Sequence, residues 1–282
     1  MEDVLFKFGL IPLYINWSHD GSIIDLGFYE LRIYSLLFGL GFVFGFILLK
    51  RHFRNASLPE EKLDNLLVFI GIGTVIGARL GHCFFYEFDY YFQNPLEILL
   101  PFRFYPEFEV TGFQGLASHG GAIGILVAVF FYSKSQEINI YWVFDKLALA
   151  VPLGCGFIRL GNLFNSEMIG HPTTVPWAFI FHWIDAIPRH PGQLYEALAY
   201  FAIFIFLNLF SNKIKKENGY LFGLFLVLLF SARFLLEFFK IDQVGFEAGM
   251  ILNMGQILSL PFIFAGIFLM RKKNHDLEKL SF

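Results

Sequence analysis

Four polar side chains follow one another closely where a long apolar stretch ends. The stretch 147–157 reads as an apolar helix, and Arg159, Asn162, Asn165 and Glu167 come directly after it. Residues three apart lie on the same face of a helix, so Arg159 and Asn162 can point into one pocket. A guanidinium group binds phosphate through two parallel hydrogen bonds and always keeps its charge. These residues therefore favour a site for an anionic ligand.

An arginine near the end of an apolar helix also has a simpler interpretation. Its charged head can reach up to the membrane surface, and Glu167 can neutralise it. At membrane depth, however, an arginine costs roughly 2.5–3.5 kcal/mol on insertion scales, so it is rarely there without a partner or an anionic ligand. Four polar groups and three glycines, Gly156, Gly161 and Gly170, favour a site over a lone anchor.

His119 precedes two glycines, in Ser-His-Gly-Gly, at the start of another apolar stretch. An imidazole can take up a proton near neutral pH, which a general base must do. Glycines beside it allow a backbone or a lipid headgroup to come close. A lone histidine at a membrane boundary is more often a hydrogen-bonding residue of the interface, so the residue alone leaves both interpretations open.

Arg233 lies deep in an apolar stretch, with Glu237 one helical turn later. The simple interpretation is an ion pair between the two side chains. A neutral pair inside a bilayer is costly to keep for structure alone, which favours a functional arginine.

Other polar residues stand at the ends of apolar stretches. Arg32 and Tyr34 head the first stretch and can be interfacial anchors or substrate contacts. Arg79, framed by small residues, fits a structural role and a site equally well. Gln193 and Glu196 share a helix face, and a carboxylate at a helix start is also favoured by the helix dipole.

Composition indicates the kind of molecule that positions these residues. The sequence is 56% hydrophobic with 39 phenylalanines and a mean hydropathy of +0.58, which indicates a membrane protein. About 20 helical residues cross a hydrocarbon core. Seven stretches come near this length, at 33–49, 66–85, 120–132, 143–164, 194–210, 221–239 and 251–270. The sequence therefore predicts an all-α integral membrane protein with about seven transmembrane helices, as a single domain over 1–282.

The distribution of basic residues predicts the orientation. Alternate connections and the tail carry thirteen of them, at Lys50, Arg51, Arg54, Lys62, Lys134, Lys146, Lys213, Lys215, Lys216, Arg271, Lys272, Lys273 and Lys279. The other connections carry four, at Lys7, Arg103, Arg189 and Lys240. Because basic residues mark the cytoplasmic side, the N-terminus is predicted outside and the C-terminus in the cytoplasm.

The two long connections, 86–118 and 165–193, fall on the outer face in this orientation. Their aromatic and proline-rich sequences suit short interfacial helices, as does 5–17, although ordinary loops explain the composition comparably well. No cleavable signal peptide is expected. Cys83 and Cys155 lie in apolar runs and read as buried hydrophobic residues. Spacings typical of metal ligands, phosphate-binding loops and hydrolase elbows are absent.

Several of these residues stand in an order that resembles one family. The run Arg-Leu-Gly-Asn-x-x-Asn-x-Glu-x-x-Gly, 159–170, resembles the signature of the bacterial prolipoprotein diacylglyceryl transferases. The Ser-His-Gly-Gly-x-x-Gly run at 118–124 resembles their histidine motif. Elements similar to the family's Arg-x-Tyr-Gly, His-Pro-x-Gln-Leu-Tyr-Glu, Arg-Phe-x-x-Glu-Phe and Met-Gly-Gln sequences also occur in the expected order. The chain departs from the usual family residues at Ser35, Ile158, Leu163, Gly192 and Leu229.

The resemblance implies an activity and a location. The chain would transfer the diacylglyceryl group of phosphatidylglycerol to the thiol of the lipobox cysteine of a preprolipoprotein and release glycerol phosphate. This is the first step of bacterial lipoprotein maturation, carried out in the cytoplasmic (inner) membrane by a multi-pass protein. It requires no cofactor or metal and no nucleic acid, only the lipid, the lipobox peptide and the bilayer.

The resemblance also implies roles for residues. The catalytic residues would be His119, as the base, with Arg159 and Arg233. The contacts to phosphatidylglycerol would be Arg159, Tyr34, Asn162, Glu167 and Gly170. Glu196 and Glu237 would support them. The alternatives are a non-catalytic phospholipid-binding or transporting membrane protein, and a family member that has lost activity.

Overall fold

The computed structural model describes residues 14–27, 30–98, 100, 102–103, 108–110, 115–211, 213, 218–241 and 249–271. The chain divides into two compact units. The first unit comprises Met1–Leu49 and Asp145–Asp276, and the second comprises Lys50–Phe144 and Leu277–Phe282. The expectation of one domain over 1–282 stays a prediction.

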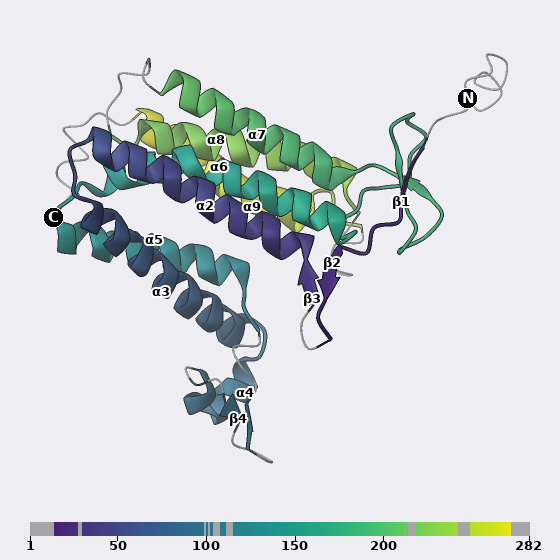
Figure 1. Ribbon diagram of the computed structural model, residues 1–282, viewed down its shortest axis with the longest axis horizontal. Helices are drawn as coiled ribbons and strands as arrows, with labels where there is room; N and C mark the ends of the chain where they lie inside the picture. Colours follow the sequence, from purple (N-terminus) through teal and green to yellow (C-terminus); the bar gives the residue numbers. More distant parts are fainter. Residues whose placement is uncertain are drawn as a thin grey trace. The chain divides into compact units, whose positions relative to one another are not determined.

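Five long helices build the first unit, and Figure 1 shows them aligned along one common direction. They are α2 (Ile33–Asn55), α6 (Ile140–Phe164), α7 (Gly192–Phe210), α8 (Tyr220–Leu236) and α9 (Met254–Arg271), with a 3-10 turn, η2 (Glu237–Phe239), after α8. A buried cluster joins α6, α7 and α8 through Leu149, Tyr200, Leu207 and Phe225. Because the apolar face of each helix meets another, the bundle can hold polar residues at one end in fixed positions.

A carboxylate of α6 caps the start of α8. Asp145, which is buried, accepts hydrogen bonds from the backbone N–H groups of Gly219 and Phe222, both at 2.8 Å. The first turn of a helix has N–H groups without partners inside the helix, so an oxygen from a neighbouring helix can satisfy them. This contact fixes where α8 begins relative to α6.

Short strands lie at one end of the first bundle (Figure 1). Strand β1 (Ile15–Trp17) pairs parallel with β6 (Phe179–Phe181), which pairs antiparallel with β7 (Pro188–Arg189). Strands β2 (Ser22–Asp25) and β3 (Glu30–Arg32) form a hairpin directly before α2. The connection 165–193 therefore contains strands and turns, whereas its composition suited short interfacial helices and ordinary loops comparably well. Its aromatic residues alternate, so that Phe179 and Phe181 are buried with Leu163 and Ile169.

Two helices, α3 (Glu60–Phe85) and α5 (Ser118–Gln136), form the centre of the second unit. They cross closely because small residues repeat every four positions on both contact faces. A Cβ atom at Gly73 would lie 2.6 Å from the Ala128 Cβ and 2.7 Å from the Gly124 carbonyl oxygen. At the far end, Tyr132 donates to the Lys62 carbonyl at 2.8 Å. Gly120, directly after His119, is also a helix-packing residue, since a Cβ there would lie 2.8 Å from Gly81 Cα.

A short connection leaves α3 in the second unit. It contains α4 (Phe88–Gln93), η1 (Pro95–Ile98), β4 (Phe102–Arg103) and β5 (Glu109–Val110), the last two paired antiparallel. Short helices thus occur in this connection, as expected, and their place at a membrane interface stays a prediction. Of the expected helix over 5–17, only residues 14–17 are described, and Ile15–Trp17 form strand β1. Most of the proline-rich run 101–106 also lies outside the described residues.

Six helices of the described chain are long and apolar enough to cross a membrane: α2, α3, α6, α7, the pair α8–η2, and α9. Many of their apolar side chains face outward, as for Phe42 (62% exposed) and Leu209 (66%), which is typical of helices in contact with lipid. The prediction of a mostly helical, multi-pass membrane protein is confirmed. The seventh stretch, 120–132, is α5, and its crossing stays a prediction because polar residues at both ends make this helix less apolar.

Candidate active site

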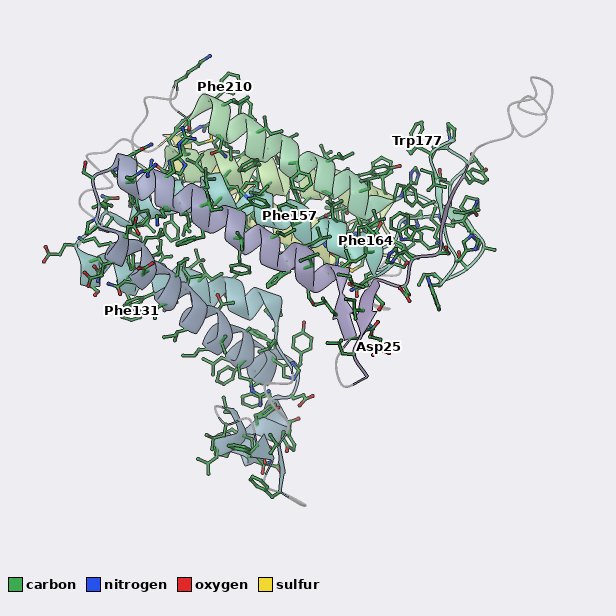
Figure 2. All side chains as sticks on the ribbon, in the orientation of Figure 1. Asp25, Phe131, Phe157, Phe164, Trp177 and Phe210 are labelled. Carbon is green, nitrogen blue, oxygen red and sulfur yellow. The ribbon has the colours of Figure 1, made fainter. Side chains whose placement is uncertain are left out.

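Arg159 and Asn162 lie in the last two turns of α6, as their spacing predicted. The Arg159 Nη1 atom donates to Asn162 Oδ1 at 3.2 Å. The helix ends because the chain turns back at Ser166 and Met168, both with positive φ, and Glu167 N donates to the Asn162 carbonyl at 2.9 Å. Figure 2 labels Phe157 and Phe164 on this segment, with Trp177 beyond the same end of the bundle.

Arg159 forms an ion pair with a carboxylate of a different helix. Its Nε atom lies 2.9 Å from Oε2 of Glu196, which is fully buried in the second turn of α7, while Arg159 itself keeps 14% exposure. Tyr200 donates to the other oxygen, Oε1, at 3.3 Å. Glu196, and not Glu167, is therefore the partner that neutralises Arg159. The residual exposure leaves the guanidinium accessible to a ligand.

A second buried ion pair joins this cluster. The Lys240 ammonium lies 3.5 Å from Glu196 Oε1 and 3.0 Å from Glu237 Oε2, and all three residues are at most 4% exposed. Gly255, at the start of α9, has no side chain where a Cβ would lie 2.7 Å from the Glu237 carboxyl carbon. The carboxylate fills that space.

Glu167 organises the two asparagines of the motif. Its Oε2 accepts from Asn162 Nδ2 at 2.9 Å, and its Oε1 accepts from Asn165 Nδ2 at 3.1 Å. The side chain of Gln193, also fully buried, donates to the Glu167 carbonyl. The buried Oδ1 of Asn165 and Oε1 of Gln193 have no hydrogen-bond partner among the described residues. These polar side chains therefore form one connected group beside Arg159.

Two predicted contact residues are placed by close packing. The ring of Tyr34 lies over Gly161, where a Cβ would come within 2.6 Å of Tyr34 Cδ2. Tyr34 is thereby held against the turn of α6 that carries Arg159 and Asn162. Gly170 is wedged between backbones, since a Cβ there would lie 2.6 Å from the Phe239 carbonyl oxygen. This packing explains its lack of a side chain, and its contact with lipid stays a prediction.

Arg233 does not form the ion pair with Glu237 that was the simpler interpretation of the sequence. Glu237 pairs with Lys240 instead, and no hydrogen bond or ion pair of Arg233 occurs within the described part of the chain. Arg233 is half-buried in the last turn of α8. Arg233 is followed by Glu237 and Lys240, and Lys240 contacts Glu196, the partner of Arg159. The two arginines therefore lie at the same end of the bundle of the first unit.

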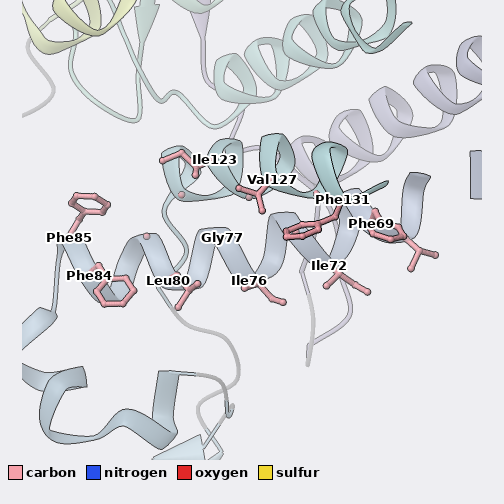
Figure 3. A pocket seen from close by; sticks show the side chains of 16 residues that line it. Phe69, Ile72, Ile76, Gly77, Leu80, Phe84, Phe85, Ile123, Val127 and Phe131 are labelled. Carbon is pink, nitrogen blue, oxygen red and sulfur yellow. The ribbon is translucent and has the colours of Figure 1, made fainter. Parts of the chain in front are cut away.

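His119 belongs to the second unit, at the first turn of α5. It is exposed, and its ring lies 5.5 Å from the ring of Phe85 and 5.9 Å from that of Tyr86. An apolar groove of about 570 Å³ runs between α3 and α5, with Phe85 and Ile123 near one end (Figure 3). These neighbours leave the imidazole free to meet a substrate, and its role as a base stays a prediction.

Arg79 has a structural role. It is 5% exposed, its Nε donates to the Ile98 carbonyl at 3.0 Å and its Nη2 to the Glu97 carbonyl at 2.6 Å. Its guanidinium also lies 4.7 Å from the centre of the Tyr91 ring. Arg79 thus ties the connection after α3 to that helix, which supports the structural interpretation.

Two titratable groups in the connection between α6 and α7 have shifted pKa values. The Arg189 guanidinium lies 2.5 Å from Asp185 Oδ2, and this hydrogen bond lowers the pKa of Asp185. Burial lowers the pKa of His190, whose Nδ1 lies 3.1 Å from the Tyr195 hydroxyl. Both contacts stabilise the connection between α6 and α7. Among the described residues, no three His, Cys, Asp or Glu side chains are placed to hold a metal ion.

Two residues that contact Glu196, Lys240 and Tyr200, were not predicted from the sequence as members of the site. Lys240 counted only as a basic residue of an outer connection, although it lies three residues after Glu237, a spacing that brings side chains together. The partnership of Arg159 with Glu196 across two helices had no signal in the sequence apart from the polarity of both residues.

Apolar helices that enclose a buried arginine–glutamate network define a multi-pass membrane protein with a polar site at the end of its bundle. The family model for prolipoprotein diacylglyceryl transferase matches residues 22–271. This chain belongs to that family. It is 47% identical over 273 residues to the phosphatidylglycerol–prolipoprotein diacylglyceryl transferase of Chloroherpeton thalassium, covering 95% of this chain and 98% of the relative.

Further relatives agree. The chain is 44% identical to the protein of the same name from Bacteroides fragilis, covering 92% of this chain and 95% of the relative. It is 46% identical to the one from Tolumonas auensis, covering 90% and 95%. The resemblance inferred from the motifs is confirmed over nearly the whole chain.

Proposed function

We propose that this chain transfers the diacylglyceryl group of phosphatidylglycerol to the cysteine thiol of preprolipoproteins. The observation that carries the proposal is the partly exposed Arg159, held by Glu196 and Asn162 in the same bundle end as Arg233. Two guanidinium groups suit the phosphate of an anionic lipid. The names of the relatives support this substrate pair, and they give no support to binding or transport without chemistry.

The reaction follows from the charges. A cysteine thiol, with an ordinary pKa of about 8.5, must lose its proton to attack, and His119 takes that proton. The thiolate forms a bond to the carbon of the diacylglyceryl group that carries the phosphate. At the same time, the bond between this carbon and its phosphate oxygen breaks. The phosphate oxygen keeps the bonding electrons and leaves as glycerol phosphate. Arg159 and Arg233 stabilise the negative charge that develops on it.

Each remaining contact has a proposed part. The lipid headgroup is oriented by the three residues next to Arg159, which are Asn162, Glu167 and Tyr34. Gly170, which has no side chain, allows the neighbouring backbone segments to pack closely. Glu196 and Glu237 support the cluster. The protein lies in the bacterial cytoplasmic membrane with its N-terminus outside and its C-terminus inside, α5 makes the seventh crossing, and the site opens to the outer leaflet, where an exported acceptor arrives.

The test is transfer by the purified protein. Micelles containing phosphatidylglycerol are mixed with a lipobox peptide or with the same peptide carrying serine in place of cysteine. Mass spectrometry should find the diacylglyceryl adduct on the cysteine peptide alone. Lipid binding without any adduct on the cysteine peptide would contradict the proposal.

A further inference from the structure

Lys240 is a buried lysine beside the proposed site and outside every residue role assigned above. It is 2% exposed, and its ammonium contacts two buried carboxylates, Glu196 at 3.5 Å and Glu237 at 3.0 Å. A buried charge is kept only where opposite charges and hydrogen bonds offset its lost hydration. The position of this ammonium is therefore set by the two carboxylates.

The main chain fixes Lys240 from two sides. Its residue pairs with Gly170 in an isolated β-bridge, and the flanking bonds His171 N to the Phe239 carbonyl (2.9 Å) and Ile241 N to the Ile169 carbonyl (3.3 Å) continue that pairing. The segment after α6 is thereby tied to the segment after α8. Lys240 sits where these two segments meet.

The stem of Lys240 is fixed by α7. A Cβ atom at Gly192 would lie 3.1 Å from Lys240 Cγ, tighter than ordinary van der Waals contact, so the stem passes directly over this glycine. Gly192 is one of the positions where the chain departs from the usual family residue. The same helix carries Glu196 one turn later, so stem and ammonium both lie against α7.

The charges of the cluster depend on this ammonium. Glu196 is shared between Arg159 Nε at 2.9 Å and Lys240. Without Lys240, Glu196 and Glu237 would lose the cation that contacts both of them, and Arg159 would be drawn toward the two carboxylates. With Lys240 offsetting Glu237, Arg159 can present its charge to a ligand.

We propose that Lys240 is a positioning residue, which holds Glu196 and offsets Glu237 so that Arg159 stays aimed at the substrate phosphate. It acts through the two carboxylates and does not touch the substrate. This inference rests on the proposed function, so every variant is compared with a wild-type protein that transfers lipid. Absence of wild-type transfer would count against the function and not against Lys240.

The experiment compares Lys240→Met, Lys240→Arg and the double variant Lys240→Met/Glu237→Gln. Transfer from phosphatidylglycerol to a lipobox peptide is measured at varied lipid concentration, per mole of folded protein in detergent. The matched control is Lys62→Met, which removes an ammonium that donates a hydrogen bond to the Gln136 carbonyl in the second unit.

Lys240→Met should lower kcat at least tenfold while KM for the lipid changes less than threefold, and Lys240→Arg should keep most of the activity. The double variant should recover at least threefold over Lys240→Met, because it removes the carboxylate that lost its partner. Lys62→Met should match wild type. Any of three results would overturn the proposal. The double variant is no more active than folded Lys240→Met, or Lys240→Met raises only KM, or Lys240→Met keeps full activity.

Discussion

Replacing Arg159 with lysine keeps the positive charge and removes the planar guanidinium group, so it tests the contribution of geometry apart from charge. In the structure the guanidinium uses two different nitrogens at once, Nε toward Glu196 at 2.9 Å and Nη1 toward Asn162 at 3.2 Å. An ammonium keeps the charge but loses the planar fork that serves both partners and a phosphate together. In Arg159→Lys the new ammonium should therefore settle on Glu196 and leave the phosphate without its oriented donors.

The size of the effect follows from the oriented N–H donors that a lysine lacks. Removing one such donor to a developing negative charge slows catalysis by about 10²–10³-fold, or about 3–4 kcal/mol. We expect the transfer rate of Arg159→Lys to fall by about that factor. The stability should change far less, since Glu196 keeps a cation beside it and Lys240 remains at 3.5 Å.

The assay measures initial rates of transfer from phosphatidylglycerol to a lipobox peptide, together with the thermal midpoint of each purified variant. The control is Arg54→Lys at the exposed end of α2, which should keep the wild-type rate. A rate for Arg159→Lys within a few-fold of wild type, at normal protein level, would show that Arg159 only anchors the helix.

Three further predictions test other parts of the molecule. His119→Gln keeps hydrogen bonding but cannot take up a proton, so it should slow transfer strongly; an unchanged rate would exclude a base. Gly73→Ala, whose Cβ would lie 2.6 Å from a side chain of α5, should destabilise the second unit by about 1–3 kcal/mol, whereas Gly71→Ala, with open space around it, should not; equal melting temperatures would contradict the packing. Asp185→Asn should lower stability at pH 7 by no more than about 1 kcal/mol, because its pKa is lowered by Arg189 in a partly exposed pair; the difference should shrink as the pH falls below about 4 and vanish only below the lowered pKa of the folded protein, where the wild-type carboxylate is itself protonated.

The sequence predicted the parts of this structure that depend on local pattern. Long apolar runs predict spanning helices because no other short-range structure satisfies a backbone in lipid. The three-residue spacing of Arg159 and Asn162 correctly placed both on one helix face, where their side chains meet. The polar motif lies in and directly after the last two turns of α6.

Contacts that depend on how the chain continues after a helix, or on distant strands, were not predictable. Arg233 and Glu237 have the right spacing for an ion pair, yet Lys240 takes Glu237 because the chain changes to a 3-10 turn after α8 and continues into a β-bridge with Gly170. The strands β6 and β7 were also missed. Strand β6 pairs with β1, more than 150 residues earlier in the chain, as in the register of Ile15 with Phe179.

The fate of the bridging oxygen in phosphatidylglycerol tests the central claim most directly. The lipid is prepared with ¹⁸O between the diacylglyceryl carbon and phosphorus, and both products of one transfer reaction are analysed by mass spectrometry. Attack of the thiolate on carbon predicts that all of the label leaves with glycerol phosphate and that the peptide carries a thioether free of it. Label retained in a diacylglycerol product, with an unmodified peptide, would contradict transfer by this route.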